Sequence, residues 1–374
     1  VLEHRLGHFR QVFDEVISEA SYSGSYTLCY PIKVNQQRHV CEEIRDVGRE
    51  LGFGFEVGSK PELMAALGLT AGDPEMPILC NGFKDGEYIE LVVLASKLGR
   101  NIVPIVERLE ELDLIVRFAK QHGHFPTIGV RARLSASGAG RWTDSSGSRG
   151  KFGLSALDLL QMLDRLRAEQ LLDKLRLLHC HVGSQIQDIS AVKRAVTELA
   201  HVYVELKRSG AALRYLDVGG GLGVDYEGSQ SVGDGSVNYG LPEYVADVVH
   251  RVMEVCDDAG VPHPDLISES GRASVAFGSV LVVDVLGARV LGAAGSDAPT
   301  VWVEAKDEGD RPRALRDLAD ASERVESGAD PAPAGPDPQR RRPAGGCHFR
   351  LGHGTRDRRS APVPGAVGPR IGPP

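Results

Sequence analysis

Residues 26–58, YTLCYPIKVNQQRHVCEEIRDVGRELGFGFEVG, carry the pattern that decides the fold prediction. An apolar run (YTLCYPIKV) leads into a segment with apolar residues at helical spacing, and a second apolar run (FGFEVG) follows. The middle segment ends in glycine, as helices commonly do. The stretch therefore predicts strand, helix and strand, which is the repeating unit of a parallel sheet.

The same alternation continues to about Ala273 and predicts eight strands. Helical segments are expected at 39–52, 60–68, 86–99, 108–123, 155–175, 189–210 and 241–260. Eight strands in about 250 residues predict an α/β fold, a (β/α)8 barrel of the TIM type, with a doubly wound open sheet as the second choice. The expected strands are residues 26–34, 53–58, 77–83, 101–107, 127–134, 175–183, 213–221 and 265–271.

Composition limits the class of protein. The chain has 374 residues, 42% of them apolar and 25% charged, which suits one large domain or two ordinary ones. A net charge of −8 argues against a nucleic-acid partner, and no apolar run approaches a membrane span. Six scattered cysteines predict buried thiols in a reducing compartment, so we expect a cytoplasmic protein.

The two ends of the chain differ from the middle. Residues 1–25 form a charged amphipathic helix that leads into the barrel of residues 26–273 and is not a signal peptide. The first residue is Val, so we expect the native start to be missing. Residues 307–374 are rich in Pro, Gly and Arg, and we expect them to be disordered. One interpretation is a functional basic tail. The favoured one is a translation in the wrong reading frame, which would explain this sudden loss of pattern after Lys306.

Polar residues that could do chemistry gather at the carboxyl ends of the predicted strands. In a barrel of this type those ends share one face, and the active site lies there. Eight independent strands would not be expected to share this feature by chance. The residues are Lys33, Glu56, Arg131, Arg133, His181, Gly219, Gly220, Gly221, Glu269 and Arg272.

Each of these residues also has a purely structural interpretation. Lys33 could extend its stem past a strand end to solvent. His179 and His181 share one face of a strand and could be hydrogen-bonded core residues; as metal ligands they lack an evident third partner. The glycines could form a plain turn, and Glu269 could pair with Arg272.

Taken together, the residues describe one pocket with the parts that a pyridoxal phosphate site needs. Burial would lower the pKa of the Lys33 amine and suit it for a covalent bond with the cofactor aldehyde. Glu269 would keep the pyridine nitrogen protonated, and His181 would stack on the ring. The groups expected to bind the phosphate are Ser184, Gly219, Gly220, Gly221, Gly271 and Arg272.

Four segments resemble the biosynthetic arginine decarboxylases, which are pyridoxal-phosphate enzymes of the alanine-racemase-like fold. They are YPIKVNQQRHV, HCHVGSQI, DVGGGLGVDYEGS and SESGRA, and the segment KFGL at 151–154 fits the same family. The likeness covers residues 1–303 and implies catalytic roles for Lys33, His181 and Glu269, with Glu56 and Arg131 also in the cofactor-binding set. The implied substrate-binding residues are Asp217, Val218, Leu222, Gly223, Val224, Asp225 and Tyr226.

The resemblance also implies an activity and partners. The reaction would convert L-arginine to agmatine and carbon dioxide, the entry to putrescine and spermidine synthesis. Intact members are expected to be homo-oligomers and to depend on magnesium, for which no ligand set can be read from the sequence.

The chain departs from this family at its carboxyl end. Residues 274–306 look like the start of the C-terminal β-domain, which is otherwise truncated or degraded. In the family that domain brings a Cys-Asp motif and a tyrosine into the partner's active site, and Cys347 lacks these neighbours. We therefore expect a chain that keeps the cofactor residues and lacks a complete dimeric site.

Three other functions stay open. The nearest is a related decarboxylase acting on lysine, ornithine or diaminopimelate. The second is a barrel that holds the cofactor without turnover. The third is a phosphosugar enzyme that uses a Schiff-base lysine without any cofactor.

Overall fold

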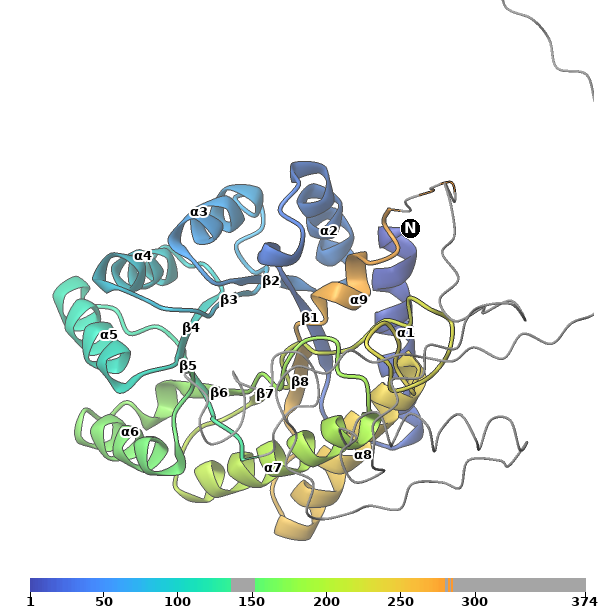
Figure 1. The fold of residues 1–374 in the computed structure, drawn as a ribbon. Coiled ribbons are helices and arrows are strands. Elements are labelled where there is room, and N and C mark those ends of the chain that lie inside the picture. The colour runs from blue at the N-terminus through green and yellow to red at the C-terminus, as the bar shows by residue number, and fades with distance from the viewer. Residues whose placement is uncertain (136–151, 280–281, 283, 285–374) are drawn as a thin grey trace, which may run out of the picture. The chain divides into compact units, whose positions relative to one another are not determined.

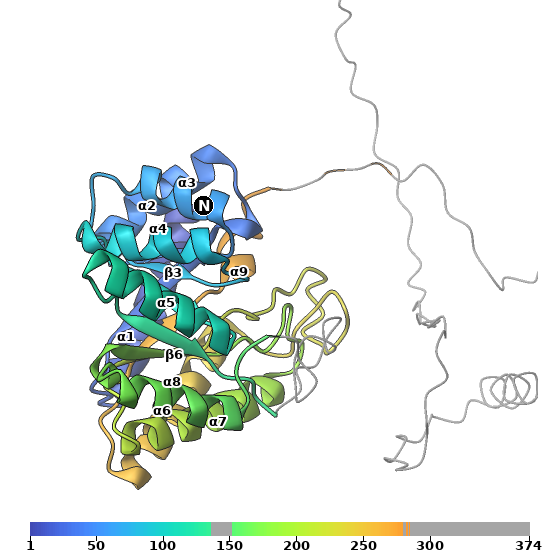
Figure 2. The same cartoon turned by 90° about the vertical axis from the view of Figure 1, so that its left-hand side faces the viewer.

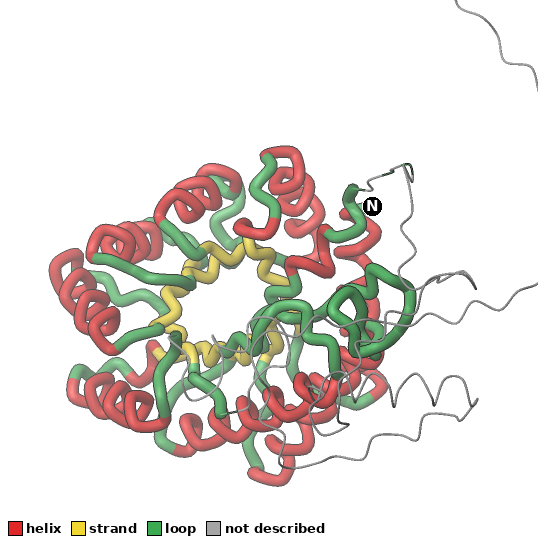
Figure 3. The backbone as a smooth tube through the Cα atoms, viewed as in Figure 1, coloured by secondary structure: helices red, strands yellow, loops and turns green. Residues whose placement is uncertain are grey.

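Eight parallel strands close into a barrel in a computed structural model that describes residues 1–135, 152–279, 282 and 284 (Figures 1 and 3). The first and last strands pair in register from Tyr26 opposite Leu266 to Leu28 opposite Ser268, which closes the ring. The predicted barrel is confirmed, and the open-sheet alternative is wrong. The strands are β1 (Tyr26–Pro31), β2 (Gly54–Val57), β3 (Ile78–Cys80), β4 (Ile102–Val106), β5 (Ile128–Arg131), β6 (Leu175–His179), β7 (Tyr215–Asp217) and β8 (Asp265–Ser268).

Helices surround the ring of strands, as Figure 3 shows. Three of them end at a glycine in the left-handed conformation, where a side chain would be strained: Gly52, Gly123 and Gly260, with φ between 65° and 68°. The helices that follow the strands are α2 (Arg38–Leu51), α3 (Lys60–Leu69), α4 (Gly86–Lys97), α5 (Leu109–His122), α6 (Ala156–Ala168), α7 (Ile189–Arg208) and α8 (Leu241–Ala259).

The first helix belongs to the barrel wall. Helix α1 (Leu2–Glu19) packs between α8 and α2, the place that a long helix after β8 would occupy in a regular barrel (Figure 1). Within the described residues, β8 is followed only by the short helix α9 (Gly271–Val275). Leu6, Phe9 and Phe13 form the buried face of α1, and the Phe13 ring stacks on Tyr26 with ring centroids 3.4 Å apart. This helix therefore completes the outer layer instead of only leading into it.

Replacing Phe13 by alanine should lower the free energy of unfolding by about 3–5 kcal/mol, the range for emptying a fully buried phenylalanine site. Phe13 is 0% exposed, whereas Phe83 is 64% exposed. The matched control Phe83→Ala should change the free energy by no more than about 1 kcal/mol. Urea unfolding measures both values, and equal losses in the two variants would show that α1 does not contribute to the barrel core.

A small apolar cluster fills the inside of the barrel. Side chains alternate between the two faces of a strand, so the neighbours of these residues join the larger core between strands and helices. Predicted buried thiols are confirmed for the described residues, where all five cysteines are free and buried. The inner cluster consists of Cys29, Leu79, Val103, Ile105, Leu177 and Ile267.

Each strand stops before the carboxyl-terminal residue that the sequence pattern predicted for it. Strand β1 stops at Pro31, before Lys33, and β6 stops at His179, before His181. Strand β7 stops at Asp217, before the three glycines. The expected site residues therefore lie in loops just beyond the strands. The loop after β7 and helix α9 project from the same side of the barrel in Figure 2.

Some expectations fall outside the described residues. They are the β-domain start beyond residue 284, the tail at 307–374, Cys347 and Lys151. Across the described part of the chain, no helix combines the length and the apolar character needed to cross a membrane.

Candidate active site

A cavity of about 600 Å³ opens at the carboxyl ends of the strands. Its walls come from the loops after β1, β6, β7 and β8, which lie far apart in the sequence. Most of the expected site residues meet here: Lys33, His181, Ser184, Gly220, Gly221, Leu222, Tyr226, Glu269, Gly271 and Arg272. A second hollow, of about 810 Å³, lies outside the barrel between α6 and α7, and none of the expected site residues lines it.

Lys33 lies in the short turn η1 (Ile32–Val34) directly after β1, with 48% of its side chain exposed. Its Nζ donates to Glu56 Oε2 over 2.8 Å, and Glu56 is fully buried in β2. Burial lowers the pKa of the amine, but Glu56 and Glu269 outweigh it and raise that pKa above its usual value. The expected lowering is therefore wrong, because the pattern around Lys33 could not reveal the two carboxylates.

Glu269 follows β8 and is 1% exposed, yet it lines the cavity. Its Oε1 accepts a hydrogen bond from Asn81 Nδ2 at 2.6 Å and lies 3.7 Å from His179 Nδ1. Burial raises the pKa of Glu269 to about 8, with the nearby Asp217 as the next cause. A cation against this carboxyl would restore its charge.

His181 follows β6 and lines the cavity beside the glycine loop, since a Cβ on Gly220 would lie 3.4 Å from its Nε2. The backbone N–H of Gly183 donates to its Nδ1 over 3.2 Å, so its proton lies on Nε2. Burial, with Arg131 and His179 nearby, lowers the pKa of His181 well below its usual value. The ring is therefore a neutral, flat surface inside the cavity.

Arg272 and the glycines form the remaining side of the cavity. Arg272 Nη2 donates to Ser184 Oγ at 3.3 Å, and Arg272 Nη1 donates to the Tyr226 hydroxyl at 3.1 Å. Its Nε is buried and has no partner among the described residues, which leaves a cationic donor available. A Cβ on Gly271 would come within 2.5 Å of the Pro31 ring, so no larger residue fits this wall.

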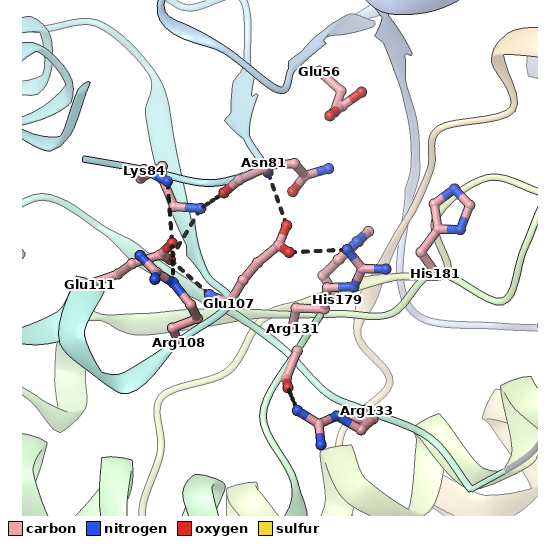
Figure 4. A network of polar contacts seen from close by, with 12 residues as sticks. Glu56, Asn81, Lys84, Glu107, Arg108, Glu111, Arg131, Arg133, His179 and His181 are labelled. Carbon is pink, nitrogen blue, oxygen red and sulfur yellow. Dashed lines mark hydrogen bonds and ion pairs between the residues drawn. The ribbon is translucent and has the colours of Figure 1, made fainter. Parts of the chain in front are cut away.

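Figure 4 shows a polar network that ties together the loops after β3 and β4 and strand β5. Lys84 Nζ and Glu111 Oε2 lie 3.2 Å apart, and both side chains are fully buried. Glu107 Oε1 accepts the Gly82 N–H at 2.9 Å, and its Oε2 pairs with Arg131 Nη1 at 3.1 Å. Burial raises the pKa of Glu107, but Arg131 and Lys84 prevail and lower it. Arg131 is therefore committed to an ion pair.

Several expected site residues do not line the cavity. Glu56 lies beneath Lys33, and Arg131 pairs with Glu107. Asp217 is 0% exposed, and its carboxylate accepts from the Gly219 N–H at 2.8 Å and pairs with His179 at 2.9 Å. The others outside the lining are Arg133, Val218, Gly219, Gly223, Val224 and Asp225.

Three residues of the site were not expected from the sequence. Asn81 directly follows β3, Glu107 directly follows β4, and Lys84 lies three residues further than Asn81. Asn81 and Glu107 are polar residues at the end of an apolar strand, the same signal that pointed to Lys33 and Glu269. Applying that rule to all eight strands would have found Asn81 and Glu107.

Comparisons with known proteins identify the family of the chain. The sequence model described as "Pyridoxal-dependent decarboxylase, pyridoxal binding domain" matches residues 6–276. The chain is 53% identical over 294 residues to a biosynthetic arginine decarboxylase of Rhodopirellula baltica, covering 79% of this chain and 44% of that protein. It is 49% identical over 286 residues to one of Citrifermentans bemidjiense, covering 76% and 45%. The chain thus spans less than half the length of these curated relatives.

Solved structures share this fold. The structure of the biosynthetic arginine decarboxylase of Campylobacter jejuni superposes with a TM-score of 0.66 at 32% identity, covering 73% of this chain and 44% of that one. A diaminopimelate decarboxylase of Helicobacter pylori, at 22% identity, shares the fold with a TM-score of 0.59, covering 73% and 62%. Because the family model matches residues 6–276, the chain belongs to the pyridoxal-dependent decarboxylase family.

Proposed function

We propose that the cavity holds pyridoxal 5′-phosphate, with Lys33 as the residue that binds its aldehyde covalently. The observation that carries the proposal is the meeting of Lys33, His181, Glu269 and Arg272 around one cavity of about 600 Å³. An amine, a neutral ring, a carboxyl and a cationic donor match the aldehyde, ring face, ring nitrogen and phosphate of this cofactor.

Adding the cofactor to the protein tests this proposal. A visible absorption band should appear, and borohydride should fix the cofactor to the peptide that contains Lys33. A protein that acquires neither the band nor the label would refute the proposed site.

Arg272 is proposed to hold the phosphate together with Ser184 and the glycine backbone. Replacing Arg272 by alanine removes charge-assisted hydrogen bonds, so the dissociation constant of the cofactor should rise about 10- to 100-fold. Arg208→Ala is a matched control because Arg208 forms an exposed ion pair with Glu205 on α7. Titration of the absorption band gives both constants, and equal constants would remove Arg272 from the phosphate site.

The residues of this chain then have separate tasks. When bound, pyridoxal phosphate supplies an electron sink for the electron pair left on the substrate as carbon dioxide departs. Glu269 holds the proton at the ring nitrogen, and the neutral His181 imidazole packs against the ring face. Glu56 accepts a hydrogen bond from Lys33 and keeps the amine at the cavity wall.

We further propose that the substrate is L-arginine and that the products are agmatine and carbon dioxide, within polyamine synthesis. Relatives 53% and 49% identical to this chain, named biosynthetic arginine decarboxylases, support this choice. Carbon dioxide release with arginine, lysine, ornithine and diaminopimelate tests it. The largest kcat/KM should belong to arginine, and preference for another amino acid would favour a related decarboxylase.

A cofactor-holding barrel without turnover is the second candidate. An absorption band with no carbon dioxide released from any of the four amino acids would identify it. Family membership argues against a phosphosugar enzyme that needs no cofactor.

Three further proposals rest on the resemblance to the arginine decarboxylases: dependence on magnesium, assembly into a homo-oligomer and a cytoplasmic location. In the described part of the chain, His179, Asp217 and Glu269 place ligand atoms within 4.8 Å of one another. His179 Nδ1 already binds Asp217 Oδ2 at 2.9 Å, and Glu269 lines the cofactor cavity, so we assign this group to the cofactor site. A cytoplasmic homo-oligomer is the expected context.

A further inference from the structure

A buried imidazole lies between two buried carboxyls beneath the cavity. His179, the last residue of β6, places its Nδ1 2.9 Å from Asp217 Oδ2 and 3.7 Å from Glu269 Oε1. His179 and Asp217 are 0% exposed, and Glu269 is 1% exposed. Two carboxylates this close cannot both stay charged in a dry interior without donors directed at them.

The hydrogen bonds define which nitrogen of His179 carries the proton. Its Nε2 is buried and has no partner among the described residues, so a proton there would lose a hydrogen bond. Burial lowers the pKa of His179 in spite of the nearby Glu269, so the ring is neutral. The ring therefore has one N–H, on Nδ1, and directs it to Asp217.

Asp217 thereby receives two donors. The Gly219 N–H reaches its Oδ1 at 2.8 Å, and the His179 N–H reaches its Oδ2 at 2.9 Å. Glu269 has a different donor, Asn81 Nδ2, at 2.6 Å. The two carboxyls thus have different surroundings. Asp217 accepts hydrogen bonds from protein donors in the interior, and Glu269 lies at the cavity wall.

We propose that His179 is a positioning residue that commits its N–H to Asp217 and, together with Asn81, keeps the Glu269 carboxylate directed at a cationic ring nitrogen in the cavity. The inference rests on the proposed function, because that ring belongs to the cofactor. Without the His179 donor, Asp217, whose pKa burial raises to about 8, would keep its proton and donate it to the neighbouring Glu269 carboxyl. A Glu269 carboxylate that accepts this hydrogen bond is a weaker base and would hold the proton of the ring nitrogen less tightly.

The absorption of the bound cofactor between pH 6 and 10 tests the proposal. In His179→Leu the midpoint of the band change should fall by about one pH unit or more, and the cofactor dissociation constant should rise about tenfold. The variant His179→Asn places an amide donor near the Nδ1 position and should stay within about threefold of the wild type. His122→Asn, which alters a histidine bound to Glu90 on the outer face, is the control and should titrate as the wild type.

Two further measurements keep the test decisive. If His179→Leu does not fold, Asn81→Leu takes its place, because it removes the donor on the other side of Glu269 and should lower the midpoint similarly. In the cofactor-free protein, ¹⁵N spectra of labelled histidine should show a neutral ring protonated on Nδ1, with that signal missing in His179→Asn.

The outcomes separate the two proposals. A wild-type protein that acquires no visible band would overturn the cofactor site and this inference together. A normal band whose pH midpoint is unchanged in His179→Leu, or in Asn81→Leu where it is the variant used, overturns only the positioning role. A His179 ring protonated on Nε2 also overturns it.

Discussion

Lys33→Ala should take up no covalently bound pyridoxal phosphate, so the visible band should be absent at every cofactor concentration. Among the described residues that line the cavity, Lys33 is the only lysine, so no second amine in this set can replace it. The Lys33 amine also lies 2.8 Å from the fully buried Glu56 carboxylate, and this ion pair holds the nucleophile at the cavity wall. Carbon dioxide release from arginine should fall by about a thousandfold or more, as for other lost nucleophiles.

The matched control is Lys60→Ala. Lys60 is an exposed lysine at the start of α3 that pairs with Asp85, and it lies outside the cavity lining. This variant should keep the band, the borohydride label and the rate. A labelled peptide that does not contain Lys33, or a band that persists in Lys33→Ala, would assign the covalent link to another residue.

Glu269→Gln should lower carbon dioxide release about 100- to 1,000-fold while the cofactor remains attached to Lys33. The loss is of the size found when one group that stabilises developing charge is removed. Glutamine keeps the shape of the side chain and can still bond to Asn81, but it carries no charge to hold a proton on the ring nitrogen. Rate and absorption measured on the same sample separate this effect from loss of cofactor, and an unchanged rate would contradict the role.

The same substitution predicts a pH effect on the stability of the cofactor-free protein. Burial raises the pKa of Glu269 from its ordinary 4.5 to about 8. Between these values the folded protein binds a proton that the unfolded chain has released, so stability falls as the pH rises through this window. Glu269→Gln cannot ionise and should lose less stability between pH 5 and 8 in urea unfolding. A steeper loss in the variant would show that the carboxyl is stabilised as an anion.

Much of the fold could be predicted from sequence because each strand and helix has its own local signal. Apolar runs, helical spacing and closing glycines such as Gly52 act over a few residues, and the structure places these elements close to the expected bounds. The carboxyl ends of the strands could not be predicted as well. Apolar residues continue past the last paired residue there, as in the Ile32 and Val34 that flank Lys33.

Within the site, it was easier to predict which residues take part than which hydrogen bonds they form with one another. Lys33, His181 and Glu269 were expected at the strand ends and line one cavity. The hydrogen bond between Asn81 and Glu269 joins residues 188 positions apart, and no local pattern reports it. For the same reason Asp217 was expected on the substrate loop, whereas its bond to His179 holds it in the interior.

The position of α1 has a consequence for how this chain reaches its native state during synthesis. Of the described elements this helix is made first, yet its neighbour α8 is made more than 200 residues later, and β1 must wait for β8 to close the ring. Contacts of such long sequence separation slow folding. Until they form, the apolar face of Leu6, Phe9 and Phe13 lacks part of its cover on the nascent chain, which makes this segment a natural binding site for chaperones.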